Sequence, residues 1–290
     1  MSIRSIATRI LFGFSDWRRD RRLRIPGGVA VQRDIPYAEG GKEHLLDLVT
    51  PSDAVGKLPV IVSVHGGGYV YGSKEVYQYY AANLAENGFA VVNFNYRLAP
   101  QSRFPAQLED INRVMSWLAS QGDSYGLDRN NVFVVGDSAG AQLVSHYLAI
   151  WSDPDFQQMF SFRMPSGLSI RAAALNCGRY RIIPGEPLFR DYLEKGVSPD
   201  DGRLDVASHI TGSFPPTFVM TSQYDFLREE ARPMYELLQS RNVDAVCRLY
   251  GQRGQRYMGH VFHCNLNLKE AKQCNREECD FFQNHLRAIE

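Results

Sequence analysis

Apolar stretches of strand length alternate with helix-patterned stretches along most of the chain. The runs at 58–64 and 132–135 are continuously apolar, which is typical of strands buried on both faces of a parallel sheet. Before them, strand-like stretches at 29–37 and 44–49 flank a Gly-rich turn and predict an antiparallel edge hairpin. Further strands are predicted at 89–96, 172–177, 217–222 and 245–250, and helices at 75–87, 105–120, 228–239 and about 267–289. This alternation predicts an α/β fold, with a mostly parallel twisted sheet of about eight strands and helices on both faces.

Two segments depart from the alternation. Residues 3–22 carry apolar side chains at helical spacing from Ile3 to Trp17 and end in a cluster of arginines. We expect this apolar stripe to pack on the body of the protein, with binding to a membrane surface as the alternative. Residues 178–214 are irregular and rich in Pro, Gly, Asp and Arg. Because this stretch is too long for an ordinary connection, we expect it to form a lid or cap.

Composition narrows the classes of partner. Lys plus Arg and Asp plus Glu both number 32, so no overall field favours nucleic acid or an anionic membrane, and a small or neutral partner is expected. The sequence has no run of about 18 apolar residues, so no membrane span is predicted.

The five cysteines do not form a disulfide framework and no secretory leader is recognisable, which indicates a cytoplasmic location. The length of 290 residues does not require two domains, and we expect a single domain over 1–290.

A sharp turn follows the strand at 132–135. The sequence there is Gly136-Asp137-Ser138-Ala139-Gly140, and apolar residues at helical spacing follow it. In such a strand–turn–helix elbow a central serine adopts a strained backbone conformation, and small flanking residues let the strand and helix approach each other. The pattern therefore makes Ser138 a candidate nucleophile, placed at the N-terminus of a helix that favours developing negative charge.

A serine nucleophile needs a base, and the base needs an orienting acid. Asp225 follows the strand at 217–222, and His260 lies in the loop after the next strand. Because both come after strands of a parallel sheet, we expect them at the same edge as Ser138, in the chain order typical of α/β-hydrolases. Glu229 and His263 are the competing acid and base. A zinc site built on His260 and its neighbours lacks a second ligand pair, so no metal and no cofactor are expected.

A second glycine-rich turn follows the strand at 58–64. It reads His65-Gly66-Gly67-Gly68, and consecutive glycines let backbone N–H groups converge where side chains would obstruct. Gly67, Gly68 and the N–H of Ala139 are the predicted donors to an oxyanion. His65 is expected to hold this loop by hydrogen bonding and not to act as a base.

These motifs resemble those of the hormone-sensitive-lipase-like carboxylesterases of the α/β-hydrolase fold. The matching stretches, within about 58–265, are His65-Gly66-Gly67-Gly68-Tyr69, Tyr96-Arg97-Leu98-Ala99-Pro100, Phe104-Pro105-Ala106, Leu108-Glu109-Asp110 and Gly136-Asp137-Ser138-Ala139-Gly140. The resemblance implies a triad of Ser138, Asp225 and His260, and a small cap built from about 1–25 and 178–214. One departure, Ala141-Gln142 where many members have Gly-Asn, also resembles kynurenine formamidases.

The motifs and the resemblance together predict a serine carboxylesterase that acts on short-chain esters, acetyl to butyryl, through an acyl-enzyme intermediate. Aromatic side chains of the cap region, Tyr69, Tyr71 and Tyr180, are expected to limit acyl length. A formamidase or amidase of the same fold is the first alternative, and a non-enzymatic ligand receptor is the second. The expected partner is a small-molecule ester, not nucleic acid; assembly as a homodimer is left open.

Overall fold

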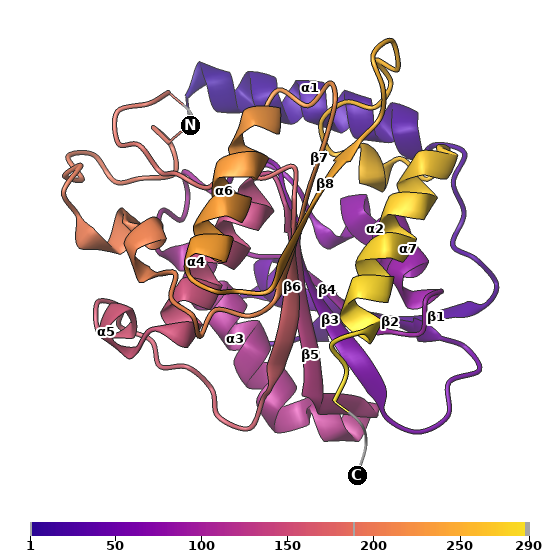
Figure 1. The fold of residues 1–290 in the computed structure, drawn as a ribbon. Coiled ribbons are helices and arrows are strands. Elements are labelled where there is room, and N and C mark those ends of the chain that lie inside the picture. The colour runs from indigo at the N-terminus through magenta and orange to yellow at the C-terminus, as the bar shows by residue number, and fades with distance from the viewer. Residues whose placement is uncertain (1, 188, 288–290) are drawn as a thin grey trace.

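The computed structural model describes residues 2–187 and 189–287, and a central eight-stranded sheet runs through them in the order β1-β2-β4-β3-β5-β6-β7-β8 (Figure 1). The strands are β1 Val29–Pro36, β2 Leu45–Pro51, β3 Leu58–Val64, β4 Ala90–Phe94, β5 Leu127–Asp137, β6 Ile170–Asn176, β7 Thr217–Ser222 and β8 Ala245–Tyr250. β2 pairs antiparallel with both β1 and β4, and the remaining neighbours are parallel. The predicted edge hairpin and the mostly parallel sheet are therefore confirmed.

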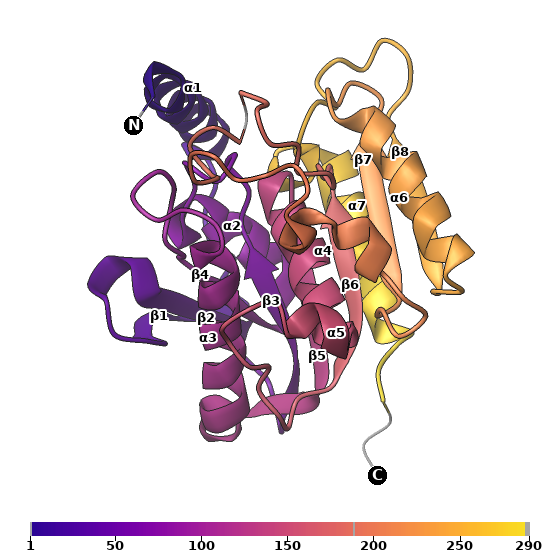
Figure 2. The same ribbon diagram turned by 90° about the vertical axis from the view of Figure 1, so that its left-hand side faces the viewer.

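Helices cover both faces of this sheet (Figures 1 and 2). They are α1 Ile3–Asp20, α2 Lys74–Ala85, α3 Ala106–Gln121, α4 Ala139–Ser152, α5 Pro154–Gln157, α6 Arg228–Ser240 and α7 Lys269–Gln283, with 3-10 turns at Gly41–His44, Gly122–Tyr125, Gly202–Leu204, Val206–His209 and Phe262–Cys264. Apolar side chains of α2 and α7 pack in one core layer, and those of α3, α4 and α6 pack in the other.

The central strands β3 and β5 contribute to both core layers, which explains the apolar runs at 58–62 and 132–135. In β5, Val132 and Val134 point into one layer, while Phe133 and Val135 point into the other. Successive side chains of a strand point to opposite faces, so a strand covered on both sides must be apolar at every position.

The C-terminal part differs in detail from the sequence prediction. The last helix was expected to run to about residue 289, but α7 ends at Gln283, and Ile289 lies outside the described residues. After α7 the chain turns back to the sheet, where the Arg287 backbone N–H donates to Asn131 Oδ1 over 2.7 Å. That hydrogen bond at the start of the β5 apolar run draws the chain away from the helical path.

The orientation of α1 contradicts the expectation that its apolar stripe packs on the body. Ile10 and Trp17 are exposed, whereas the polar face of the helix faces the protein. Arg9 Nε donates to the Val70 carbonyl over 2.7 Å, and the Tyr71 hydroxyl donates to Asp16 over 2.8 Å. The edge of the sheet presents carbonyl and hydroxyl groups to this helix, so its polar side chains find partners there and its apolar ones do not.

The long segment between β6 and β7 is irregular, as expected, and contacts the start of α1. Asp191 accepts hydrogen bonds from the Ser2 backbone N–H, from the Ser2 hydroxyl and from Ser5. The two segments that flank the body thus meet over the carboxyl edge of the sheet. Within the part of the chain that the structure describes, no helix combines the length and apolarity needed to cross a bilayer.

Candidate active site

Ser138 occupies a strained turn between β5 and α4. Its backbone has φ 53° and ψ −116°, a conformation that residues other than glycine rarely adopt. A Cβ on Gly136 would lie 2.4 Å from the Gly140 carbonyl oxygen, and a Cβ on Gly140 would lie 2.1 Å from that of Val64. Both flanking positions must therefore be small, because α4 touches β5 at Gly136 and touches the end of β3 at Gly140.

A chain of hydrogen bonds connects Ser138 to His260 and Asp225. His260 Nε2 lies 2.9 Å from Ser138 Oγ, and His260 Nδ1 lies 2.7 Å from Asp225 Oδ1. The Asp225 carboxylate also accepts from the Leu227 backbone N–H over 2.8 Å and from the Thr221 hydroxyl over 2.9 Å. These bonds fix the carboxylate, which in turn fixes the imidazole ring with one nitrogen toward the serine.

The two competing residues lie elsewhere. His263 is fully buried beside Cys264, and burial lowers the pKa of its imidazole to about 3. Glu229 is exposed on α6 and pairs with Arg228. His260 and Asp225 are therefore the pair that the structure brings to Ser138.

The electrostatics of Asp225 favour its ionised form. Burial raises the pKa of this carboxyl, but the hydrogen bond and charge of His260, the Leu227 N–H and the Cys177 thiol lower it, and the net pKa is below the ordinary value of 3.8. An ionised Asp225 can accept the Nδ1 proton of His260 and stabilise the positive charge that the ring would gain.

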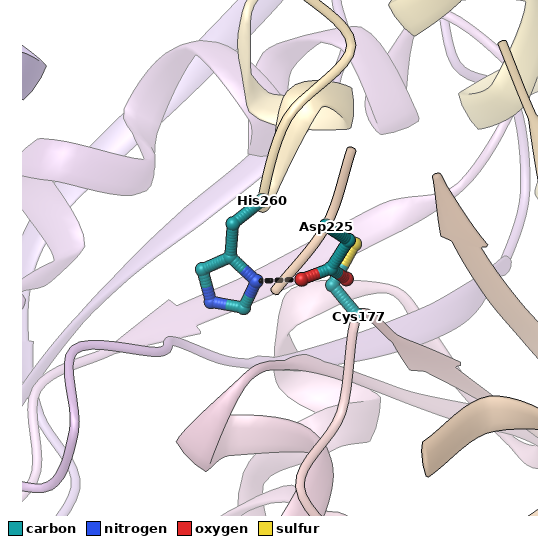
Figure 3. A group of neighbouring side chains, drawn as sticks. All are labelled: Cys177, Asp225 and His260. Carbon is teal, nitrogen blue, oxygen red and sulfur yellow. Dashed lines mark hydrogen bonds and ion pairs between the residues drawn. The ribbon is translucent and has the colours of Figure 1, made fainter. Parts of the chain in front are cut away.

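Cys177 is a neighbour of Asp225 that the sequence reasoning missed, although it directly follows β6 at the same edge (Figure 3). Its sulfur, the Asp225 carboxylate and the His260 imidazole lie within 4.8 Å of one another, a spacing that a metal ion could bridge. Burial and the nearby Asp225 charge raise the pKa of the Cys177 thiol. Because a protonated thiol is a hydrogen-bond donor and a poor metal ligand, we interpret Cys177 as a support for Asp225.

Hydrogen bonds to Asp137, in the elbow, and to Tyr77, in α2, hold the glycine-rich loop after β3. The Gly66 N–H lies 3.1 Å from Asp137 Oδ1 and 3.0 Å from the Tyr77 hydroxyl. Gly67 has φ 119°, and a Cβ there would lie 2.1 Å from the Tyr71 carbonyl oxygen. Only glycine fits this position, so the loop can bring its backbone next to Ser138, with which Gly67 lines one cavity.

His65 lies next to this loop, and its role in holding the loop stays a prediction. Its Nδ1 is 2.8 Å from the Gly66 carbonyl, and its ring stacks on Tyr96 with centroids 4.1 Å apart. Burial lowers the pKa of His65 to about 4, so the ring is neutral at pH 7. Asp137, by contrast, has its pKa raised by burial to about 6, although it accepts hydrogen bonds from Gly66 and Tyr77.

A cavity of about 220 Å³ opens at Ser138 and His260. Its walls come from the glycine-rich loop, from the Phe226 and Val261 loops and from the inner face of α1, which contributes Phe12, Ser15, Asp16 and Arg19. No pattern in the sequence identified the α1 residues as cavity walls, since their role depends on which face of the helix meets the body.

Of the three tyrosines predicted to line the substrate pocket, Tyr71 does so. Tyr69 instead is buried in the core, where its ring stacks on Tyr192 with centroids 3.8 Å apart. Tyr180 lines a separate apolar cavity of about 110 Å³ between α4 and α6 and donates to the Leu175 carbonyl over 3.3 Å. The assignment of Tyr69 and Tyr180 to the cavity at Ser138 is therefore wrong, because each hydroxyl has a partner that holds its ring away from it.

A family model described as alpha/beta hydrolase fold matches residues 61–263, more than half of the chain. The chain belongs to the hormone-sensitive-lipase-like carboxylesterase family of the α/β-hydrolase fold. The esterase LipQ of Mycobacterium tuberculosis is similar to it, with 29% identity over 233 residues, 76% of this chain and 53% of LipQ. The chain spans about half the length of these curated relatives that it matches, which also include LipM and LipC of the same organism.

Solved structures of other esterases share the fold. Esterase B of Lactobacillus rhamnosis superposes with a TM-score of 0.88 at 23% identity, covering 97% of this chain and 93% of that one. The esterase of Pyrobaculum calidifontis superposes with a TM-score of 0.77 at 25% identity, covering 98% and 93% of the two chains. The fold is therefore shared with these structures along nearly all of the length of the chain.

Proposed function

We propose that the protein is a serine carboxylesterase that hydrolyses short-chain acyl esters, acetyl to butyryl, through an acyl-enzyme intermediate. The observation that supports this most directly is the pair of hydrogen bonds from His260, one to Ser138 Oγ at 2.9 Å and one to Asp225 at 2.7 Å. Nucleophile, base and orienting acid are thus in contact, and the nucleophile faces a cavity. This is the arrangement that activates a serine hydroxyl.

In the proposed reaction, Ser138 Oγ attacks the ester carbonyl carbon as His260 Nε2 takes its proton. The oxyanion of the tetrahedral intermediate accepts hydrogen bonds from the backbone N–H groups of Gly67, Gly68 and Ala139. His260 then gives its proton to the leaving alcohol, and the acyl group stays on Ser138. Water attacks the acyl-enzyme with His260 again as base, which releases the acid and restores the serine. Asp225 stabilises the imidazolium in both steps.

The size of the cavity supports short acyl groups. A volume of about 220 Å³ is below the roughly 300 to 1,000 Å³ of pockets that hold drug-sized ligands. Aromatic rings of Phe12, Tyr71 and Phe226 stand in its wall. One structure of the Lactobacillus esterase B carries a tributyrin phosphonate inhibitor, so a related fold accommodates butyryl groups.

The N-terminal segment, about 1–25, and the segment at 178–214 are proposed to form a cap on one domain that spans 1–290. Their contact through Asp191 with Ser2 and Ser5 and the place of α1 in the cavity wall support this. All five cysteines are free, and four of them are buried, which agrees with the proposed location in the reducing cytoplasm.

The structure offers little for the amidase alternative. Gln142, the residue that suggested it, is fully buried, and its side chain contacts the Tyr69 hydroxyl and His146. It therefore acts in the scaffold and not at the reacting carbonyl. Relative rates on matched ester and anilide substrates would reveal an amidase, and stoichiometric binding of an ester without turnover would reveal a receptor.

The test is hydrolysis of nitrophenyl esters from acetyl to dodecanoyl by wild type and Ser138→Ala. We expect turnover to be highest for acyl groups of about two to four carbons and kcat to fall about a millionfold in the variant, because nucleophile and base act as a unit. Ser152→Ala is the matched control, since that hydroxyl bonds only to its own helix, over 2.8 Å to Leu148. Retention of most activity by Ser138→Ala would contradict the proposal.

A further inference from the structure

The outer face of α1 is apolar and exposed. Ile10, Leu11 and Phe14 are 66%, 67% and 64% exposed, and Trp17 is 59% exposed. They recur at helical spacing, so they form one stripe along the helix. Burying apolar surface is favourable by about 25 cal/mol per Å², and a helix that keeps such a stripe in water is typical of a surface that binds something.

Hydrogen bonds to the body fix this outward orientation. On the opposite face of the helix, Ser5 donates to Asp191 and Arg9 donates to the Val70 carbonyl. Asp16 on the same face accepts from the Tyr71 hydroxyl. Arg19 adds a hydrogen bond of 3.2 Å to the Val76 carbonyl. Rotating α1 to bury its stripe would break these hydrogen bonds and leave the Val70 and Val76 carbonyls without these partners. The stripe is therefore a permanent feature of the surface.

Exposed arginines cluster near the C-terminal end of the stripe. Arg18, Arg21, Arg22 and Arg24, at and beyond the C-terminal end of α1, are all exposed. Arg253 and Arg256 are exposed in the loop after β8, which rises at the same edge of the molecule as α1 in both views (Figures 1 and 2). Although the whole chain has no net charge, this edge is locally basic.

We propose that this edge, the α1 stripe with its arginines, docks on an anionic phospholipid surface. The boundary between acyl chains and phosphate head groups suits such a helix. Acyl chains can contact its apolar face, and phosphates can bind its arginines. A second copy of the chain would cover the apolar stripe but would not supply phosphate groups for the arginines. The proposal stands on exposure and charge and does not depend on the proposed esterase activity.

Docking in this way would place the lipid next to the helix that forms one wall of the cavity. Phe12, Asp16 and Arg19 of α1 form part of its wall, and Phe226, 73% exposed, stands beside His260 with ring centroids 4.2 Å apart. An apolar molecule dissolved in the lipid surface would then reach the cavity along α1 without crossing bulk water.

The test is cosedimentation of the full chain with vesicles of phosphatidylcholine alone or mixed in equal parts with phosphatidylglycerol. We expect binding to the mixed vesicles that weakens with added salt, with a blue shift of Trp17 emission that is missing in Trp17→Phe. The double variants Ile10→Ser/Phe14→Ser and Arg21→Gln/Arg22→Gln should each bind about tenfold or more weakly. Thermal unfolding of each variant checks that it is folded.

Val55→Ser is the matched control. Val55 is 95% exposed, but it lies in the loop before β3, at the opposite edge of the sheet from α1 and Ser138. It should bind vesicles as wild type does. Failure of wild type to bind mixed vesicles, or equal binding by the stripe variants, would overturn the proposal. A concentration-dependent dimer that Ile10→Ser/Phe14→Ser converts to monomer would also overturn it, in favour of a contact between copies.

Discussion

The orientation of one imidazole ring decides what the site can do. Asp225 Oδ1 lies 2.7 Å from His260 Nδ1, and His260 Nε2 lies 2.9 Å from Ser138 Oγ. The hydrogen bond to a carboxylate makes Nδ1 the protonated nitrogen and leaves Nε2 free to accept the serine proton. In the proposed reaction, Asp225 thus acts only through the ring that it positions.

We predict that Asp225→Asn lowers kcat on nitrophenyl acetate by about 10⁴-fold, because an amide can favour the wrong histidine tautomer while leaving the geometry intact. Glu229→Gln, at the competing carboxyl paired with Arg228, should leave kcat unchanged. Steady-state kinetics of the two purified variants give the comparison. A large loss in Glu229→Gln with little loss in Asp225→Asn would reverse the assignment.

At the scale of elements, α1 depends on a single carboxylate for its N-terminal attachment. The hydrogen bonds from Ser2 and Ser5 lower the pKa of Asp191 to about 2, against the effect of its partial burial. Asp191 therefore stays ionised at neutral pH and joins α1 to the segment at 178–214. The helix itself begins at this contact, since the Ser2 hydroxyl also accepts the Ser5 backbone N–H.

We predict that Asp191→Ala loosens α1 without unfolding the body, because it leaves the two serines without their acceptor, a loss of about 1–2 kcal/mol. Trypsin should cut after Arg9 faster in this variant, and KM for nitrophenyl esters should rise more than kcat falls. Asp200→Ala, at an exposed residue of the same segment, serves as the control. Equal cleavage rates in all three proteins would show that Asp191 does not secure the helix.

At the scale of the whole molecule, a buried carboxyl links α7 to the sheet. Glu278 accepts hydrogen bonds from the Tyr80 hydroxyl of α2 over 2.8 Å and from Asn176 Nδ2 of β6 over 2.6 Å. Burial, which these two donors only partly offset, raises its pKa from 4.5 to about 7. The folded protein therefore holds a proton there over a pH range in which the unfolded chain has released it.

We predict that Glu278 lowers the free energy of unfolding by on the order of 3 kcal/mol as pH rises from 4.5 to about 7. Below that window the residue is protonated in both the folded and the unfolded state, and above it the residue is ionised in both. Because buried histidines such as His65 and His263 have lowered pKa values and act in the opposite direction, the contribution is read from urea unfolding as the free energy of wild type minus that of Glu278→Gln, which should fall across the range. Glu236→Gln, which removes an exposed carboxyl paired with Arg232, controls for the loss of one charge and should keep the wild-type slope.

The sequence by itself determined the features that depend on neighbours in the chain. The apolar run of β5 must be a strand covered on both faces, and the elbow needs glycine at 136 and 140 because helix and strand touch there. The order of strands also put Ser138, Asp225 and His260 at one edge, since parallel strands end together. Each of these follows from local periodicity or from topology, which a sequence records directly.

Only the tertiary structure decided which faces and rings meet. The spacing of apolar residues in α1 shows that its two faces differ, but the partners at the sheet edge determine that the polar face turns inward. In the same way, Tyr69 is drawn into the core by Tyr192, and Cys177 reaches Asp225 from a different strand. Such contacts join residues far apart in the chain, and their outcome depends on which polar groups the folded body leaves unpaired.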